Sequence, residues 1–214
     1  MTRSSLIVGS LCLFTSVAQA HISVDLGGTH KSRYADAGLK AGPCGMAGGT
    51  RGTNIFTYKP GATITVSITE TIPHPGYFRV AFDNEGDDGF VTPSGTEGTM
   101  GACAGDPKCG AGKADYCNND SVLLDNLNAA GPHGFSTKHT FSVKLPDVEC
   151  TNCTLQIIQV MNDLNIHGAP YPADDVYYQC IDLVLSKTAM DVMPPATPVV
   201  NNGMVCKGAA PGGT

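Results

Sequence analysis

Beyond its first 20 residues, the sequence lacks an excess of positive charge, a second long hydrophobic run, an internal repeat and sustained helical periodicity. Its 214 residues include 13 Lys and Arg against 19 Asp and Glu, which gives a net charge of −6. An acidic chain is a poor candidate for binding nucleic acid or an anionic membrane surface. Because no later apolar run could span a bilayer, we also expect no membrane anchor.

The first 20 residues have the pattern of a secretory signal peptide. Arg3 gives a positive start, an apolar run extends from Leu6 to Val17, and Ala18-Gln19-Ala20 is the small-x-small pattern that signal peptidase cuts after. Cleavage there leaves 194 residues, enough for one domain with a sizeable core. Arg3 is lost, so 12 basic residues face 19 acidic ones, a net charge of −7. We expect a secreted protein, extracellular or periplasmic.

Cleavage after Ala20 would make His21 the first residue of the mature chain. Its free α-amine and its imidazole would then form a bidentate chelate, and among the common divalent ions this donor pair suits copper best. The alternative is that a histidine follows the cleavage site by coincidence. His21 therefore indicates a metal site only together with a second ligand.

The best candidate for that second ligand is His74. It lies in Ile72-Pro73-His74-Pro75-Gly76, between two expected strands, and the prolines restrict the backbone on both sides of it. A histidine held in this way is pre-positioned for a metal, although a turn histidine facing solvent is the alternative. The remaining histidines have weaker claims. We expect His133 and His167 at the surface or beside the ligands. His139 should face outward on a strand and have no role. His30 lies in the first loop, and the sequence does not decide its role.

Seven short segments have the alternation or composition of β-strands. They are His21–Leu26, Asn54–Tyr58, Ala62–Thr69, Tyr77–Phe82, His139–Leu145, Thr154–Met161 and Val176–Leu185. We expect an all-β fold, an antiparallel β-sandwich of immunoglobulin or fibronectin-III type with long disulfide-clamped loops. The domain would span 21–186 after a signal peptide at 1–20. Residues 83–131 would be loop with one helical turn near Val122–Leu127, and a Pro- and Gly-rich tail at 187–214 would be tied back by Cys206.

Removal of the signal peptide takes Cys12 and leaves an even number of cysteines. The eight are Cys44, Cys103, Cys109, Cys117, Cys150, Cys153, Cys180 and Cys206. In an exported chain this count predicts up to four disulfides. Cys150-Thr-Asn-Cys153 could instead be a redox or zinc motif, but no second CxxC and no βαβ pattern accompany it. Cys150 and Cys153 are either bonded to each other or to separate partners.

Four segments in order resemble the lytic polysaccharide monooxygenases, in particular the secreted bacterial proteins of this type. The segments are His21 after the signal, His74-Pro75-Gly76-Tyr77, Cys150-Thr-Asn-Cys153-Thr-Leu-Gln-Ile-Ile-Gln-Val-Met161, and Tyr177-Tyr178-Gln179-Cys180-Ile181-Asp182. The likeness covers about residues 21–186. It implies a histidine brace, in which His21 binds copper through its amine and Nδ1 and His74 through a ring nitrogen. It also implies that Tyr177 lies on the axial side of the copper, Gln159 near the oxygen site, and Cys44 bonded to Cys180.

The resemblance implies a copper-dependent enzyme that oxidatively cleaves glycosidic bonds in a polysaccharide of the chitin or cellulose class. Its partners would be that polysaccharide and an external electron donor, and we expect a monomer. One departure matters: many members bind their substrate through a flat surface with Tyr or Trp, and this chain has no Trp. The alternative function is therefore a non-catalytic protein that binds or handles copper with the same brace. A third hypothesis is an exported adhesion protein, a β-sandwich stabilised by disulfides, in which the histidine at the cleavage site has no role.

Overall fold

Ten strands, in the part of the chain that the computed structural model describes, form two sheets. The described residues are 21–27, 30–74, 76–90, 121–128, 133–161, 176–191 and 204–205. The strands are β1 His21–Leu26, β2 His30–Lys31, β3 Ile55–Tyr58, β4 Thr63–Ile72, β5 Gly76–Asp83, β6 Val122–Leu127, β7 Thr137–Lys144, β8 Cys150–Met161, β9 Val176–Leu185 and β10 Met204–Val205. None of the described residues forms a helix that could cross a membrane.

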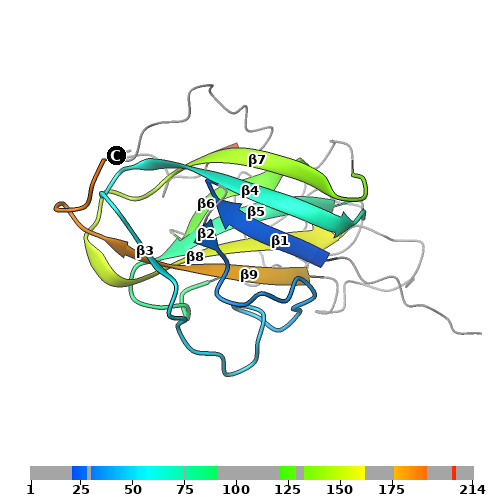
Figure 1. Ribbon diagram of the computed structural model, residues 1–214, viewed down its shortest axis with the longest axis horizontal. Helices are drawn as coiled ribbons and strands as arrows, with labels where there is room; N and C mark the ends of the chain where they lie inside the picture. The colour runs from blue at the N-terminus through cyan, green and yellow to red at the C-terminus, as the bar shows by residue number, and fades with distance from the viewer. Residues whose placement is uncertain are drawn as a thin grey trace, which may run out of the picture.

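The two sheets have the orders β2-β1-β4-β7 and β10-β6-β5-β8-β9-β3 and pack face to face (Figure 1). The strands of the first sheet pair antiparallel, and in the second only β3 and β9 run parallel. The expected all-β sandwich is therefore confirmed, with one parallel pair at the edge of its larger sheet.

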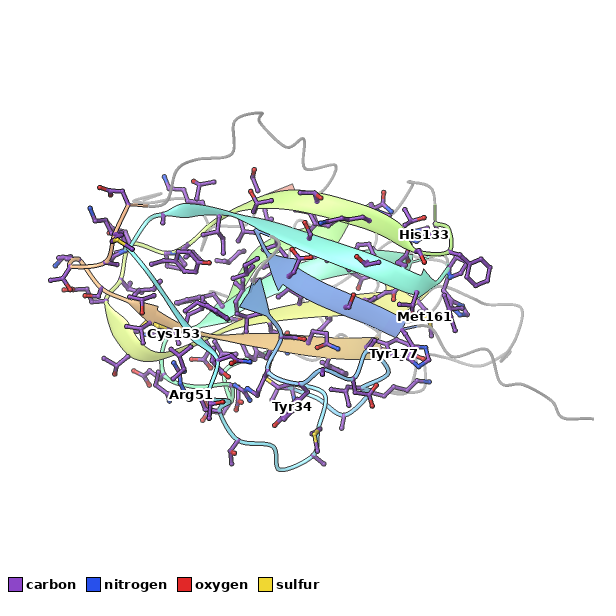
Figure 2. The ribbon with its side chains drawn as sticks, viewed as in Figure 1. Tyr34, Arg51, His133, Cys153, Met161 and Tyr177 are labelled. Carbon is purple, nitrogen blue, oxygen red and sulfur yellow. A yellow bond between two sulfur atoms is a disulfide. The ribbon has the colours of Figure 1, made fainter. Side chains whose placement is uncertain are left out.

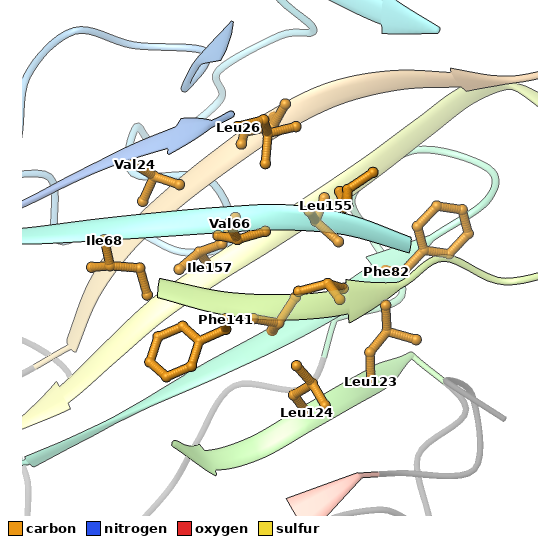
Figure 3. Packing of buried hydrophobic residues seen from close by; sticks show 14 of the residues in the cluster. Val24, Leu26, Val66, Ile68, Phe82, Leu123, Leu124, Phe141, Leu155 and Ile157 are labelled. Atoms are coloured by element: carbon orange, nitrogen blue, oxygen red, sulfur yellow. The ribbon is translucent and has the colours of Figure 1, made fainter. Parts of the chain in front are cut away.

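Alternation along the strands places the core between the sheets. In β4, Ile64, Val66 and Ile68 are all buried, as the period of two requires. They meet residues of the opposite sheet such as Leu155 and Ile157 of β8, which belong to the same apolar cluster (Figure 3). Burial of this continuous cluster is the main favourable contribution to folding.

The expected helical turn near Val122–Leu127 is wrong, because this segment is strand β6. It pairs with β5 on one side and with the short β10 on the other. Its apolar spacing suits a turn of helix as well as a strand buried on both faces, and pairing with neighbouring strands decides between the two. The pairing also shows that Met204 and Val205 of the tail return to the sheet.

Two disulfides join described cysteines. Cys44 is bonded to Cys180 of β9, as the resemblance implied, and Cys150 is bonded to Cys153, one of the two alternatives left open. The first bond ties the long loop after β2 to the centre of a strand 136 positions later. The bonds expected for Cys103, Cys109, Cys117 and Cys206 lie outside the described residues.

Candidate functional site

Strand register gathers the predicted site residues at one end of the sandwich. His21 at the start of β1 is the partner of Ile72 at the end of β4, and the chain then turns at Pro73 and His74 into the other sheet. At the same end, Gln159 of β8 is the partner of Tyr177 of β9. Figure 2 shows Tyr177 and His133 at this end of the molecule.

His21 is held by both its backbone and its ring. Its carbonyl oxygen accepts a hydrogen bond from the Thr71 hydroxyl at 3.0 Å. The centroid of its imidazole lies 6.1 Å from that of the Tyr177 ring. The loop after β2 closes over the same ring at Gly38, where a Cβ atom would lie 2.7 Å from both Cδ2 and Nε2 of His21. Any side chain at position 38 would therefore displace the imidazole.

His74 is buried, with 7% of its surface exposed. The alternative of a turn histidine facing solvent is therefore wrong. His74 follows Ile72, the cross-strand partner of His21, by two residues, so the fold brings the two predicted ligands to adjacent positions of one sheet end. Both side chains are imidazoles, which suit copper and zinc alike.

Tyr177 and Tyr178 point to opposite sides of β9, as expected for successive residues of a strand. Tyr177 is fully buried in the main core cluster, whereas Tyr178 belongs to a smaller cluster on the outer face of the sheet. The ammonium of Lys40 lies 5.0 Å from the centroid of the Tyr177 ring, within the range of a cation–π interaction. Of the two tyrosines, Tyr177 is therefore the one whose ring lies near the His21 imidazole, and it is the one that the resemblance assigned to the metal site.

Gln159 is fully buried between the sheets, and its amide Nε2 donates to Oε1 of Glu70 at 2.7 Å. Glu70 also accepts from Nδ1 of His133 at 2.7 Å and from Nε2 of His139 at 2.8 Å. Burial alone raises the pKa of the Glu70 carboxyl, but the hydrogen bonds and charges of the two histidines outweigh it and hold that pKa below its ordinary value. Glu70 therefore holds a carboxylate in the core.

The expectation that His139 faces outward with no role is wrong. Its side chain is 8% exposed and forms a hydrogen bond with Glu70. The reason is its phase on β7, since His139 alternates with Phe141 and Val143, which are both in the core. The same rule could have identified Glu70, which follows Ile68 by two residues on β4 and continues its buried series.

The structure describes His133 and the backbone of His30, but not His167. His133, expected at the surface or beside the ligands, has a side chain 11% exposed and in contact with Glu70. His30 begins the two-residue strand β2, and His167 lies outside the described residues.

Comparison with known proteins gives one family. The sequence model described as "Lytic polysaccharide mono-oxygenase, cellulose-degrading" matches residues 15–183, which is most of the chain. A comparison with curated proteins finds no match.

Proposed function

Because the chain belongs to the lytic polysaccharide mono-oxygenase family, we propose that it is a secreted, copper-dependent enzyme that oxidatively cleaves glycosidic bonds in a polysaccharide of the chitin or cellulose class. The observation that carries the proposal is the pairing of His21 with Ile72, two residues before His74. This register puts His21, which cleavage after Ala20 would make the first residue, at the same end of the sheet as the buried histidine of the turn.

The donor set fits copper. Two imidazoles and the amine created by cleavage after Ala20 would supply three nitrogen ligands, which copper binds more tightly than other divalent first-row ions do. Bound copper would supply the reactivity toward O₂ or H₂O₂. The resulting oxidant would remove a hydrogen atom from a sugar carbon. Such chemistry belongs to the metal, while the protein fixes the ligands and the surroundings.

The surrounding residues would orient the ligands and limit access. Gly38 lets its loop pack against the His21 imidazole, and the buried Tyr177 ring packs beside it. His74 is restrained by its prolines and shielded from water. Gln159, whose amide is fixed by Glu70, would place a polar group near the site without adding a charge.

Copper titration of the correctly processed protein, followed by mass spectrometry of the products from chitin and from cellulose, tests the proposal. Tight binding of one copper and oxidised oligosaccharides are the expected results, and the mass and position of the oxidation distinguish attack at C1 from attack at C4. The reaction needs an external electron donor, so ascorbate is added as a reductant and omitted in the control.

The second candidate is a non-catalytic copper-binding protein with the same ligands. It is favoured by one observation, the absence of tryptophan from the chain, because an aromatic platform is a common way to hold a polysaccharide. Tight copper binding without products from either polymer would support this alternative and reject the enzyme.

A further inference from the structure

A carboxylate and two imidazoles meet between the sheets, apart from the two proposed copper ligands. We propose that Glu70, His133 and His139 form a second metal site, for a divalent ion of the zinc type. Each of the three can contribute one ligand atom, and these atoms all lie within 4.8 Å of one another. This site does not depend on the proposed function, because it uses neither His21 nor His74.

The ligand set is one that zinc prefers. Two histidine nitrogens and one carboxylate oxygen, with a fourth position for water, form a common zinc site in proteins. Nδ1 of His133 and Nε2 of His139 approach different oxygens of the same carboxylate, Oε1 at 2.7 Å and Oε2 at 2.8 Å. Small movements of the three side chains would direct these atoms at one ion.

The protein holds two of the three ligands on neighbouring strands, and His133 lies in the segment before β7. Glu70 is on β4 and His139 on the adjacent β7, where Glu70 pairs with Thr137 and Ile68 with His139. From the opposite sheet, Gln159 donates to Oε1 of Glu70. Such a contact to a ligating carboxylate is typical of metal sites, where outer groups orient the ligands.

The charge of the cluster favours a cation. Glu70 is fully buried, and none of the described Lys or Arg side chains forms an ion pair with it, whereas the buried Arg33 and Arg79 pair with aspartates. The two histidines compensate the buried Glu70 charge only while they are protonated, and a buried charge without a partner is costly. A divalent ion bound to neutral imidazoles would take over this compensation.

Two buried polar atoms, one in the cluster and one on the adjacent Gln159, have no hydrogen-bond partner among the described residues. They are Nε2 of His133 and Oε1 of Gln159. Buried polar atoms normally have partners. Oε1 of Gln159 could accept a hydrogen bond from a water on the ion, whereas Nε2 of His133, the nitrogen that would not bind the ion, points to a separate ordered water. His133 is the member of the cluster with most contact to solvent, because its side chain is 11% exposed, against 8% for His139 and 0% for Glu70.

The test uses the processed full-length protein with His21→Ala and His74→Ala, which removes both proposed copper ligands and leaves the cluster intact. After treatment with a chelator, the protein is titrated with Zn²⁺ and, separately, with Co²⁺. We expect one equivalent of zinc, visible absorption bands of tetrahedral or five-coordinate Co²⁺, and a higher Tm with zinc. No binding of either ion would mean that the cluster is only hydrogen-bonded, and would overturn the proposal.

A further substitution in the same double variant tests whether the zinc is bound by this cluster. His133→Ala changes the most exposed of the three ligands and is expected to lower zinc affinity at least about 10-fold. The matched control is Lys138→Ala, which changes an exposed side chain on β7 and should leave affinity unchanged. Equal zinc affinity in all three proteins would place the ion elsewhere and overturn the proposal. Because the first titration needs no change in the cluster, the proposal remains testable even where His133→Ala does not fold.

Discussion

Arg33 and Asp182 form a buried, two-pronged ion pair between the long loop and β9. Nε of Arg33 lies 3.1 Å from Oδ2, and Nη2 lies 2.6 Å from Oδ1. The two side chains are 1% and 0% exposed. Together with the bond between Cys44 and Cys180, this pair fixes the loop that continues to Gly38 and the His21 ring.

Arg33→Met is expected to destabilise the fold by about 3–5 kcal/mol, because it leaves the Asp182 carboxylate buried without its cation. Asp182 would keep a weaker compensation from the backbone N–H of Gly52, at 2.7 Å. Denaturant-induced unfolding measures the loss. The double variant Arg33→Met/Asp182→Leu removes both charges of this pair and should recover part of the stability. Asp87, whose side chain is 30% exposed and pairs with Nη1 of Arg33 at 2.7 Å, loses its cation in both variants. A single variant as stable as the unchanged protein would show that the pair contributes nothing.

The strands of the core were predictable because their alternation is local. In β4 and β1 the apolar residues recur at every second position, and the structure confirms both strands to within a few residues. Two features were not local. Segment Val122–Leu127 becomes a strand through its pairing partners, and the parallel pairing of β3 with β9 joins residues more than 120 positions apart.

The site divides in the same way. A cleavage pattern and a proline-flanked histidine, both in short stretches of sequence, are enough to propose His21 and His74 as ligands. The cluster around Glu70 needs the pairing of β4 with β7 and the contact with β8 from the opposite sheet. The sequence could show only that these side chains point into the core, because Glu70 follows Ile68 by two residues and His139 precedes Phe141 by two.

Stability is expected to fall at alkaline pH because of Tyr58. This residue is 7% exposed, and burial raises the pKa of its hydroxyl from 10.0 to about 12. The folded state thus holds the proton more tightly than the unfolded state. The resulting contribution is complete below pH 10 and is lost as the pH rises through 12; a shift of this size corresponds to about 3 kcal/mol.

Tyr58→Phe should remove this part of the alkaline loss, so the variant should lose less stability than the unchanged protein between pH 10 and 12. Urea unfolding at a series of pH values measures the difference. Tyr34→Phe is the control, since the Tyr34 hydroxyl makes an exposed hydrogen bond to the Thr50 carbonyl. Identical pH profiles for the unchanged protein and Tyr58→Phe would contradict the prediction.

His74→Ala is expected to weaken copper binding by more than about 100-fold, because changes beyond the ligands themselves already cost 10- to 100-fold. The substitution also removes a buried ring, so a moderate decrease in Tm is expected, with the sandwich retained. Calorimetric copper titration and circular dichroism measure the two effects. Unchanged copper affinity would transfer the second ligand position to His133, His167 or His30.

The last prediction concerns the amine of His21, which exists only after cleavage. In the precursor this nitrogen is a peptide amide bonded to Ala20, and an amide must lose a proton before it can bind a metal well. Cleavage makes it a primary amine with a pKa of about 8, and copper readily replaces the proton of such an amine. A protein with one extra residue before His21 should therefore have an unchanged Tm, copper affinity lower by orders of magnitude, and no oxidised products. The matched control is the same extension removed by a protease to restore His21 as the first residue, which should recover both properties. If the extended protein binds copper as tightly as the processed one, the amine is not a ligand, and the brace and the enzymatic function built on it are rejected.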